Sequence, residues 1–204
     1  MNLRFVCDAD ERVGFGHLQR CVQLGRLAGL RRPIDGLVFQ GCYSVAARRR
    51  IAAAFPTARI VDEEDSAACD IAVMDRLGDP DELDSHPQEL MQAVAPLARR
   101  YVQIVSGTTA PELPKGVCVG YQPGGPDRTA PDVRWGLQYA PVPPDLLSDA
   151  SAIMRRPDRA LIALGGNTDL APVFLALDAM ARLTEIAQVD VLLSPLADPP
   201  AVSA

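Results

Sequence analysis

The sequence predicts an α/β protein built on a parallel sheet. Short apolar runs of five or six residues alternate with longer segments whose apolar residues recur at helical spacing. The runs are mostly apolar, as in strands that are covered on both faces. Strands and helices in steady alternation require right-handed crossovers, which produce a parallel sheet with helices packed against it. We therefore expect a Rossmann-like domain in residues 1–105.

This domain is expected to hold five strands and three helices. A helix over Ser44–Phe55 begins at a serine that can cap its first free amides. Pro87 suits the first turn of the third helix, and Pro96 can kink or divide that helix. The expected strands are Leu3–Cys7, Asp35–Gln40, Ala58–Asp62, Asp70–Asp75 and Tyr101–Val105, and the expected helices are His17–Arg32, Ser44–Phe55 and Pro87–Arg100.

The second half of the chain has a different composition. Residues 106–157 hold much of the proline and glycine and are expected to connect two folded parts, with short strands at Gly116–Gly120 and Val133–Val142. A second α/β unit is expected in residues 158–204. Its strands are Arg159–Gly166 and Gln188–Ser194, and its helix runs from about Asp169 to Leu183. One such unit cannot cover both faces of a sheet, so it is interpreted as a partial second α/β domain.

Composition and charge exclude several classes of protein. The net charge of −6 among 204 residues argues against a surface that follows nucleic-acid phosphates, although a small anion can still bind locally. No apolar run reaches the roughly 18 residues of a membrane span, and early acids interrupt any signal-peptide core, so a cytoplasmic protein is expected. Five scattered cysteines without a C-x-x-C pair indicate reduced, mostly buried thiols. With only two histidines, a metal site is not expected, nor is a cofactor.

The loop between the first strand and the first helix holds the residues of greatest chemical interest. Ligands of open parallel sheets bind beyond the carboxyl ends of the strands, where this loop lies. Gly14 and Gly16 allow a tight turn and leave helix amides free for an anion. The helix dipole favours a neutral His17 that can act as a base, and Arg20 lies on the same helical side. A glycine turn with a capping histidine and no chemistry is an equal alternative. The spacing is not that of a dinucleotide fingerprint.

Two further places could contribute to a site. Asp75 ends the fourth expected strand and could orient a base or a sugar hydroxyl, or it could simply cap a loop. Gly165, Gly166 and Asn167 follow a later strand, an arrangement that leaves amides free for a phosphate or a sugar. The alternative there is that Thr168 or Asn167 only caps the next helix.

Taken together, these motifs resemble a known family. The chain is similar to the UDP-2,4-diacetamido-2,4,6-trideoxy-β-L-altropyranose hydrolase of pseudaminic acid biosynthesis and to its relatives in spore-coat polysaccharide synthesis. The central match consists of Asp8, Gly14, Phe15, Gly16, His17 and Arg20. Further matches follow in the same order at Val73–Gly78, Trp135–Val142 and Ala163–Asp169.

The resemblance implies a fold, an activity and roles for single residues. The fold is the GT-B type, in which two Rossmann-like domains face each other across a cleft, and residues 1–105 would be its N-terminal domain. His17 would activate a water molecule that attacks the anomeric carbon and releases UDP with inversion, without a metal or another cofactor. The partner would be a small nucleotide sugar. Substrate would be contacted by Asp8, Gly14, Phe15, Gly16, Arg20, Asp75 and Tyr139, and the nucleotide by Gly165, Gly166 and Asn167.

The chain departs from the family pattern in several places. Val6 or Cys7 stands at the position of a basic residue, and Arg76 and Leu77 replace a His-Tyr pair. The segment after the fifth strand lacks the family's aspartates. The family also has a complete C-terminal uridine-binding half, of which only a first unit is recognisable here. Three functions are therefore considered: a UDP-sugar hydrolase, a catalytically weakened sugar- or nucleotide-binding module, and a GT-B-type glycosyltransferase.

Overall fold

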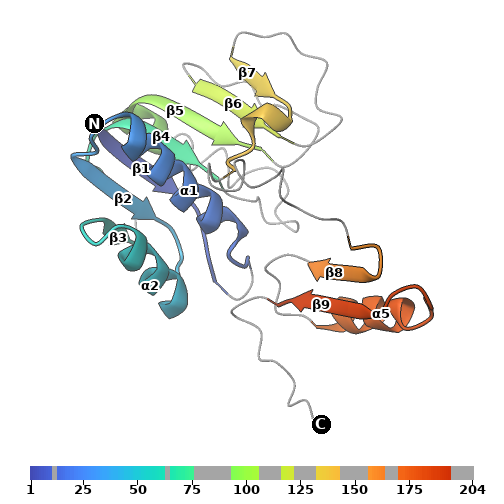
Figure 1. Ribbon diagram of the computed structural model, residues 1–204. Helices are drawn as coiled ribbons and strands as arrows, with labels where there is room; N and C mark the ends of the chain where they lie inside the picture. Colours follow the sequence, from blue (N-terminus) through green and yellow to red (C-terminus); the bar gives the residue numbers. More distant parts are fainter. Residues whose placement is uncertain are drawn as a thin grey trace.

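The chain forms a seven-stranded parallel sheet followed by a small βαβ unit (Figure 1). The computed structural model describes residues 1–10, 13–62, 65–75, 93–105, 116–121, 132–142, 156–163 and 170–193. The strands of the large sheet are β1 (Asn2–Val6), β2 (Gly36–Gln40), β3 (Arg59–Val61), β4 (Cys69–Met74), β5 (Ala98–Ile104), β6 (Gly116–Gly120) and β7 (Val133–Trp135).

The strand order identifies where a ligand would bind. The order is β3-β2-β1-β4-β5-β6-β7, with every neighbouring pair parallel. The chain builds outward from β1 to β3 and then returns to place β4 on the other side of β1. This reversal makes the β1–β4 junction a topological switch point, whose carboxyl edge is the usual ligand-binding crevice of such sheets. The predicted Rossmann-like parallel sheet is confirmed.

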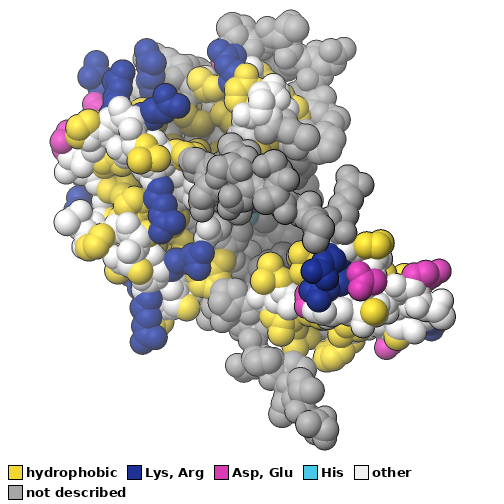
Figure 2. Space-filling model, viewed as in Figure 1, with side chains coloured by type: hydrophobic (Ala, Val, Ile, Leu, Met, Phe, Trp, Pro, Cys, Tyr) yellow, Lys and Arg dark blue, Asp and Glu magenta, His cyan; other side chains and the backbone are white. Residues whose placement is uncertain are grey.

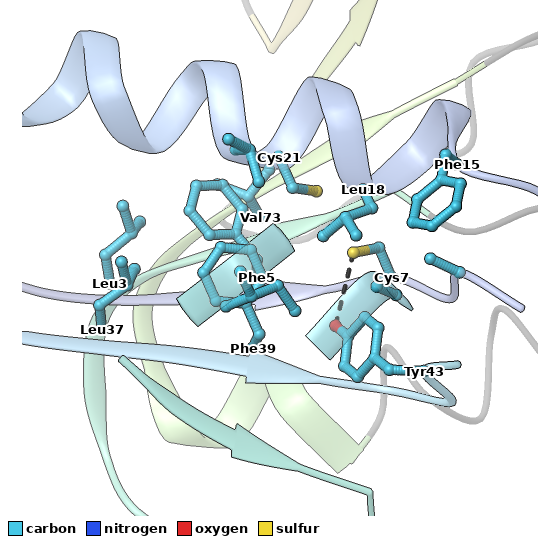
Figure 3. Close-up of a cluster of buried hydrophobic side chains, with 14 of the residues drawn as sticks. Leu3, Phe5, Cys7, Phe15, Leu18, Cys21, Leu37, Phe39, Tyr43 and Val73 are labelled. Atoms are coloured by element: carbon cyan, nitrogen blue, oxygen red, sulfur yellow. Dashed lines mark hydrogen bonds between the residues drawn. The ribbon is translucent and has the colours of Figure 1, made fainter. Parts of the chain in front are cut away.

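One face of the sheet is covered by α1 (Gly16–Arg31) and α2 (Val45–Ala54). Figure 3 shows Leu18 and Cys21 of α1 lying over Phe5 of β1 and Phe39 of β2. The two phenyl rings are 5.2 Å apart between centroids. Full burial of a side chain of this size contributes roughly 1.5–3 kcal/mol, so this cluster is the main apolar support of the sheet. As predicted, Ser44 caps α2, because its hydroxyl accepts a hydrogen bond from the Ala47 amide at 3.2 Å.

The opposite face combines a second apolar cluster with a buried cation. The apolar residues come mainly from β1 and from β4 to β7, including Met74, Tyr101 and Cys118. Beside them Arg4 is almost fully buried in the middle of β1. Its guanidinium donates to the carbonyl oxygens of Asp65 and Ala67 at 2.5 and 2.6 Å, and lies 3.3 Å from the Asp65 carboxylate. Arg4 therefore holds the segment before β4 against the sheet.

Two parts of the sheet differ from the sequence prediction. The predicted helix over Pro87–Arg100 is wrong at its end, because Ala95–Leu97 form a short 3-10 helix (η1) and Ala98–Arg100 already belong to β5. Pro96 lies in that 3-10 turn, and the next residues pair with β4 instead of continuing a helix. In addition, β6 and β7 join the large sheet, which therefore extends to Trp135, well beyond residue 105.

The small unit consists of β8 (Arg159–Ala163), α5 (Ala171–Met180) and β9 (Gln188–Leu192). The two strands are parallel and form a sheet of their own. Ile162 and Val173 are buried, whereas Leu161 and Leu192 are exposed. One face of this small sheet is thus uncovered in the described structure, in line with a partial α/β unit.

Within these ranges, no helix has both the length and the apolar character that crossing a membrane requires. All five cysteines are free thiols, and all except Cys42 are buried.

Replacing Gly41 with alanine should destabilise the fold. Gly41 follows β2 with a φ of 150°, a conformation that side chains rarely adopt, and a Cβ there would overlap the carbonyl oxygen of Cys7. We expect Gly41→Ala to lower the free energy of unfolding by about 2 kcal/mol or more, measured by urea denaturation. Gly29→Ala is the matched control, since its Cβ would meet only an ordinary contact at 3.8 Å and helix propensity favours alanine by roughly 0.5–1 kcal/mol. Equal effects of both changes would contradict this account.

Burial of Cys118 should make the fold sensitive to alkaline pH. Burial, with a smaller effect of the Asp132 charge, raises the pKa of Cys118 from 9.0 to about 11. Between these values the unfolded chain loses a proton that the folded chain keeps, so the free energy of unfolding falls as pH rises. We expect Cys118→Ala to lose less stability than the wild type between pH 8 and pH 11 in urea titrations. Parallel losses in both proteins would show that this thiol is not responsible.

Candidate functional site

Three polar side chains meet at the carboxyl edge of the β1–β4 junction. His17 and Arg20 come from the first turns of α1, and Asp75 directly follows β4. The Asp75 amide donates to the carbonyl oxygen of Val6 at 2.9 Å, so the backbone that carries this carboxylate is fixed to the end of β1. We refer to His17, Arg20 and Asp75 as the His17 cluster.

The His17 cluster is a closed hydrogen-bonded network. His17 Nδ1 lies 2.7 Å from Asp75 Oδ1, while Arg20 donates from Nε to Oδ2 at 2.7 Å and from Nη2 to Oδ1 at 2.9 Å. The Arg20 guanidinium thus donates two parallel hydrogen bonds to the Asp75 carboxylate, which is the strongest geometry for this pair. Asp75 is 2% exposed and His17 is 5% exposed. The network is therefore largely shielded from water.

The network determines which nitrogen of His17 carries a proton. A carboxylate paired with a guanidinium has only acceptor atoms to offer, so Nδ1 can bind Asp75 Oδ1 only as an N–H donor. Arg20 Nη2 also lies 2.8 Å from Nδ1, because Nδ1 and Nη2 both donate to Asp75 Oδ1. Nε2 consequently carries the lone pair of the neutral ring. None of the described residues makes a hydrogen bond to Nε2.

Arg20 is held from two sides. Burial lowers the pKa of Arg20, but the hydrogen bonds and the charge of Asp75 outweigh this effect and raise it above its ordinary value. The guanidinium carbon also lies 5.9 Å from the ring centroid of Tyr121, within the range of a cation–π contact. Arg20 is therefore a fixed positive charge beside the imidazole.

Tyr121 was not predicted as a site residue. It directly follows β6, so it lies at the same carboxyl edge as Asp75. The strand before it was expected to belong to a connecting region, so Tyr121 was not expected to share a sheet edge with Asp75. A strand assignment for Gly116–Gly120 within the large sheet would have drawn attention to it.

The start of α1 supplies backbone donors beside the cluster. Gly14 has a φ of 75°, which is the left-handed conformation that glycine adopts without strain. The residue before α1, Phe15, makes no side-chain cap, and the first turn contains no acidic residue. A Cβ on Gly16 would lie 3.7 Å from Arg20 Nη1, so the guanidinium closely approaches the helix start. Phe15 itself packs into the apolar cluster (Figure 3).

Asp8 has a different environment from the His17 cluster. It is buried, and its Oδ1 accepts a hydrogen bond from the Cys42 amide at 2.8 Å. Next to it the amide of Ala9 donates to the carbonyl oxygen of Cys42 at 2.9 Å. Asp8 therefore ties the loop after β1 to the loop after β2, and so fixes the direction in which the chain leaves β1.

Of the remaining predicted residues, the structure describes only Tyr139. Tyr139 is exposed in the short 3-10 helix η2 (Leu137–Tyr139), and no hydrogen bond or ring contact among the described residues joins it to His17. Gly165, Gly166 and Asn167 lie outside the described residues, as do Arg76 and Leu77.

A layer of buried thiols lies below the cluster. Cys21 is one helical turn after His17, and burial together with a hydrogen bond to Cys7 raises the pKa of Cys21 well above its usual value. The sulfur of Cys7 lies 3.5 Å from the Tyr43 hydroxyl, as Figure 3 shows. Burial also raises the pKa of Tyr43, so Cys21 and Tyr43 are neutral groups near the cluster. In the described part of the chain, no group of three or more His, Cys, Asp or Glu side chains could hold a metal ion.

Comparison with protein-family models, with curated proteins and with solved structures finds no match to this chain. The geometry of the His17 cluster and the sequence motifs are therefore the basis for a functional proposal.

The tautomer of His17 can be measured directly. The chain has two histidines, so long-range ¹H–¹⁵N spectra of the imidazoles contain few signals. We expect one ring with its proton on Nδ1, and we expect Asp75→Ala to abolish that preference because Nε2–H is the commoner form of a free neutral imidazole. Substitution of the exposed residue Gln19 by alanine should leave the spectrum unchanged. An Nε2-protonated His17 in the wild type would refute the assignment.

Proposed function

We propose that this chain is a UDP-sugar hydrolase-like protein in which His17 acts as the general base. The observation that carries the proposal is the hydrogen bond from His17 Nδ1 to Asp75, which leaves Nε2 as the basic atom at the carboxyl edge of the switch point. A base that is oriented by a buried carboxylate is a recurrent device for taking a proton from a hydroxyl or from water.

The proposed reaction is a single displacement. His17 Nε2 removes a proton from water while the water oxygen bonds to the anomeric carbon of the sugar. The bond between that carbon and the phosphate oxygen breaks, and its electron pair leaves with UDP, so the configuration inverts. The imidazolium that forms is stabilised by Asp75, and Arg20 holds Asp75 in place. General-base catalysis of this kind typically contributes about 10²–10⁴-fold in rate.

The finer features of the resemblance are part of the same proposal. The large sheet would be the N-terminal half of a GT-B arrangement, and β8, α5 and β9 would begin the half that binds the nucleotide. The segment between β8 and α5 contains Gly165, Gly166 and Asn167, which would face the diphosphate. A glycosyltransferase would use the same arrangement with a sugar hydroxyl in place of water.

The burial of His17 favours a second candidate function. The His17 ring is only 5% exposed, which leaves room for a water molecule at Nε2 but not for a larger group. A sugar reaches Nε2 only after the surroundings of the ring open. A sugar- or nucleotide-binding module needs no such opening, because the cluster would then serve to hold α1 and β4 together.

The two candidates differ in the effect of removing His17. We expect the wild type to release UDP from a UDP-sugar, with UDP-2,4-diacetamido-2,4,6-trideoxy-β-L-altropyranose and UDP-N-acetylglucosamine as first substrates. His17→Ala should lower the rate at least 100-fold, and Asp75→Asn should lower it less, because Asp75 acts through the ring. Gln19→Ala, which changes an exposed side chain of the same helix, is the matched control and should keep full activity. The rate is measured by coupled detection of free UDP.

Isotope labelling tests the bond that breaks. In H₂¹⁸O the label should appear in the sugar and not in UDP, because attack occurs at carbon. Binding of UDP-sugars by calorimetry without any release, unchanged in His17→Ala, would support the binding module instead. Small and equal losses in His17→Ala and Asp75→Asn would place the chemistry elsewhere.

A further inference from the structure

A hollow lies at the amino edge of the large sheet, where the strands begin. It has a volume of about 610 Å³, which falls within the roughly 300–1,000 Å³ of small-molecule sites. It lies at the opposite ends of β1 and β4 from the His17 cluster, so it does not belong to the site described above. Its lining residues are Met1, Arg32, Asp70, Ile71, Arg99 and Arg100.

The sheet register explains why arginines surround this hollow. Arg99 and Arg100 are consecutive on β5, so their side chains leave opposite faces of the strand. Pairing of β5 with β6 begins only at Tyr101, which means that both arginines lie on the part of β5 that projects beyond β6. Arg100 pairs with Ile71 of β4, and Arg32 ends α1 above the same edge. Figure 2 shows arginine side chains gathered over this end of the molecule, near the start of the chain.

The hollow has an excess of positive charge. Its one lining acid, Asp70, accepts a hydrogen bond from the Asn2 amide at 2.8 Å and lies 3.8 Å from Arg99. The terminal amine of Met1 is paired with the carboxylate of Asp35. By contrast, the guanidinium groups of Arg32 and Arg100 have no hydrogen bond or ion pair with any described residue. Among the described lining residues, three arginines against one aspartate leave two positive charges unmatched.

We propose that this hollow, the amino-edge pocket, binds a small molecule that carries a phosphomonoester. A phosphomonoester has a charge of about −1.5 to −2 at pH 7, which matches the excess in the pocket. The planar fork of an arginine donates two parallel hydrogen bonds to phosphate oxygens, and two such forks are unengaged here. Ile71 and Met1 provide an apolar surface for the organic part of the ligand. A single carboxylate would leave one of the charges unmatched.

Calorimetric titration with phenyl phosphate tests the proposal, since this compound combines a phosphomonoester with an apolar ring. In 0.15 M NaCl, which screens exposed charges beyond about 8 Å, we expect saturable binding of one molecule per chain. Arg32→Gln and Arg100→Gln should each weaken binding about tenfold or more, because each removes charge-assisted hydrogen bonds. Inorganic phosphate should bind more weakly than phenyl phosphate because it does not use the apolar surface.

Matched variants separate this site from other causes. Arg26→Gln removes an exposed arginine of α1 outside the pocket and should leave binding unchanged. His17→Ala should also leave it unchanged. The proposal is overturned by an absence of saturable binding, or by equal weakening in Arg26→Gln, which would indicate diffuse attraction. It is equally overturned if His17→Ala abolishes binding while Arg100→Gln does not. Because Arg26, Arg32 and Arg100 are all exposed, circular dichroism should show that each of these arginine variants stays folded.

Discussion

Asp75 joins the backbone of the sheet to the side chains of the His17 cluster at its carboxyl edge. Its amide makes a hydrogen bond to the last residue of β1, and its carboxylate accepts hydrogen bonds from both His17 and Arg20. One residue therefore connects β1, β4 and the start of α1 at the switch point of the sheet. The position of the imidazole, the tautomer of its ring and the direction of the Arg20 guanidinium all depend on this carboxylate.

Such a network is expensive to bury and costly to disrupt. Moving a carboxylate and a guanidinium out of water costs several kcal/mol, which is recovered only when the partners are well oriented. Here two parallel hydrogen bonds from Arg20 and one from His17 use most of the acceptor capacity of Asp75. On the opposite face, carbonyl oxygens and Asp65 surround the guanidinium of Arg4, whose buried Nε makes no hydrogen bond. Both cations are integral to the fold, and the apolar clusters are arranged around them.

Much of the fold could be predicted from periodicity and end signals. The first four strands, α1 and the Ser44 cap follow from local patterns, and the observed ends of these elements differ from the predicted ends by at most one residue. The contact between His17 and Asp75 could not be predicted in this way, although each residue was singled out. It depends on β4 lying next to β1, which is a property of strand order and not of any local segment. Tyr121 was missed for the same reason: a short strand was expected at Gly116–Gly120, but not its place beside β5 in the large sheet. The end of the third predicted helix was wrong because pairing with β4 overrode helical propensity at Ala98–Arg100.

The small sheet of β8 and β9 has a consequence for the behaviour of the chain in solution. Among the described residues, each strand pairs only with the other, so each leaves one row of amide and carbonyl groups open. Leu161 and Leu192 stand exposed on the same small sheet. An open strand edge beside apolar side chains is a template for further strand pairing, the geometry from which self-association and domain exchange begin. The colloidal behaviour of this chain should therefore depend on what covers β8 and β9 far more than on the well-enclosed sheet that precedes them.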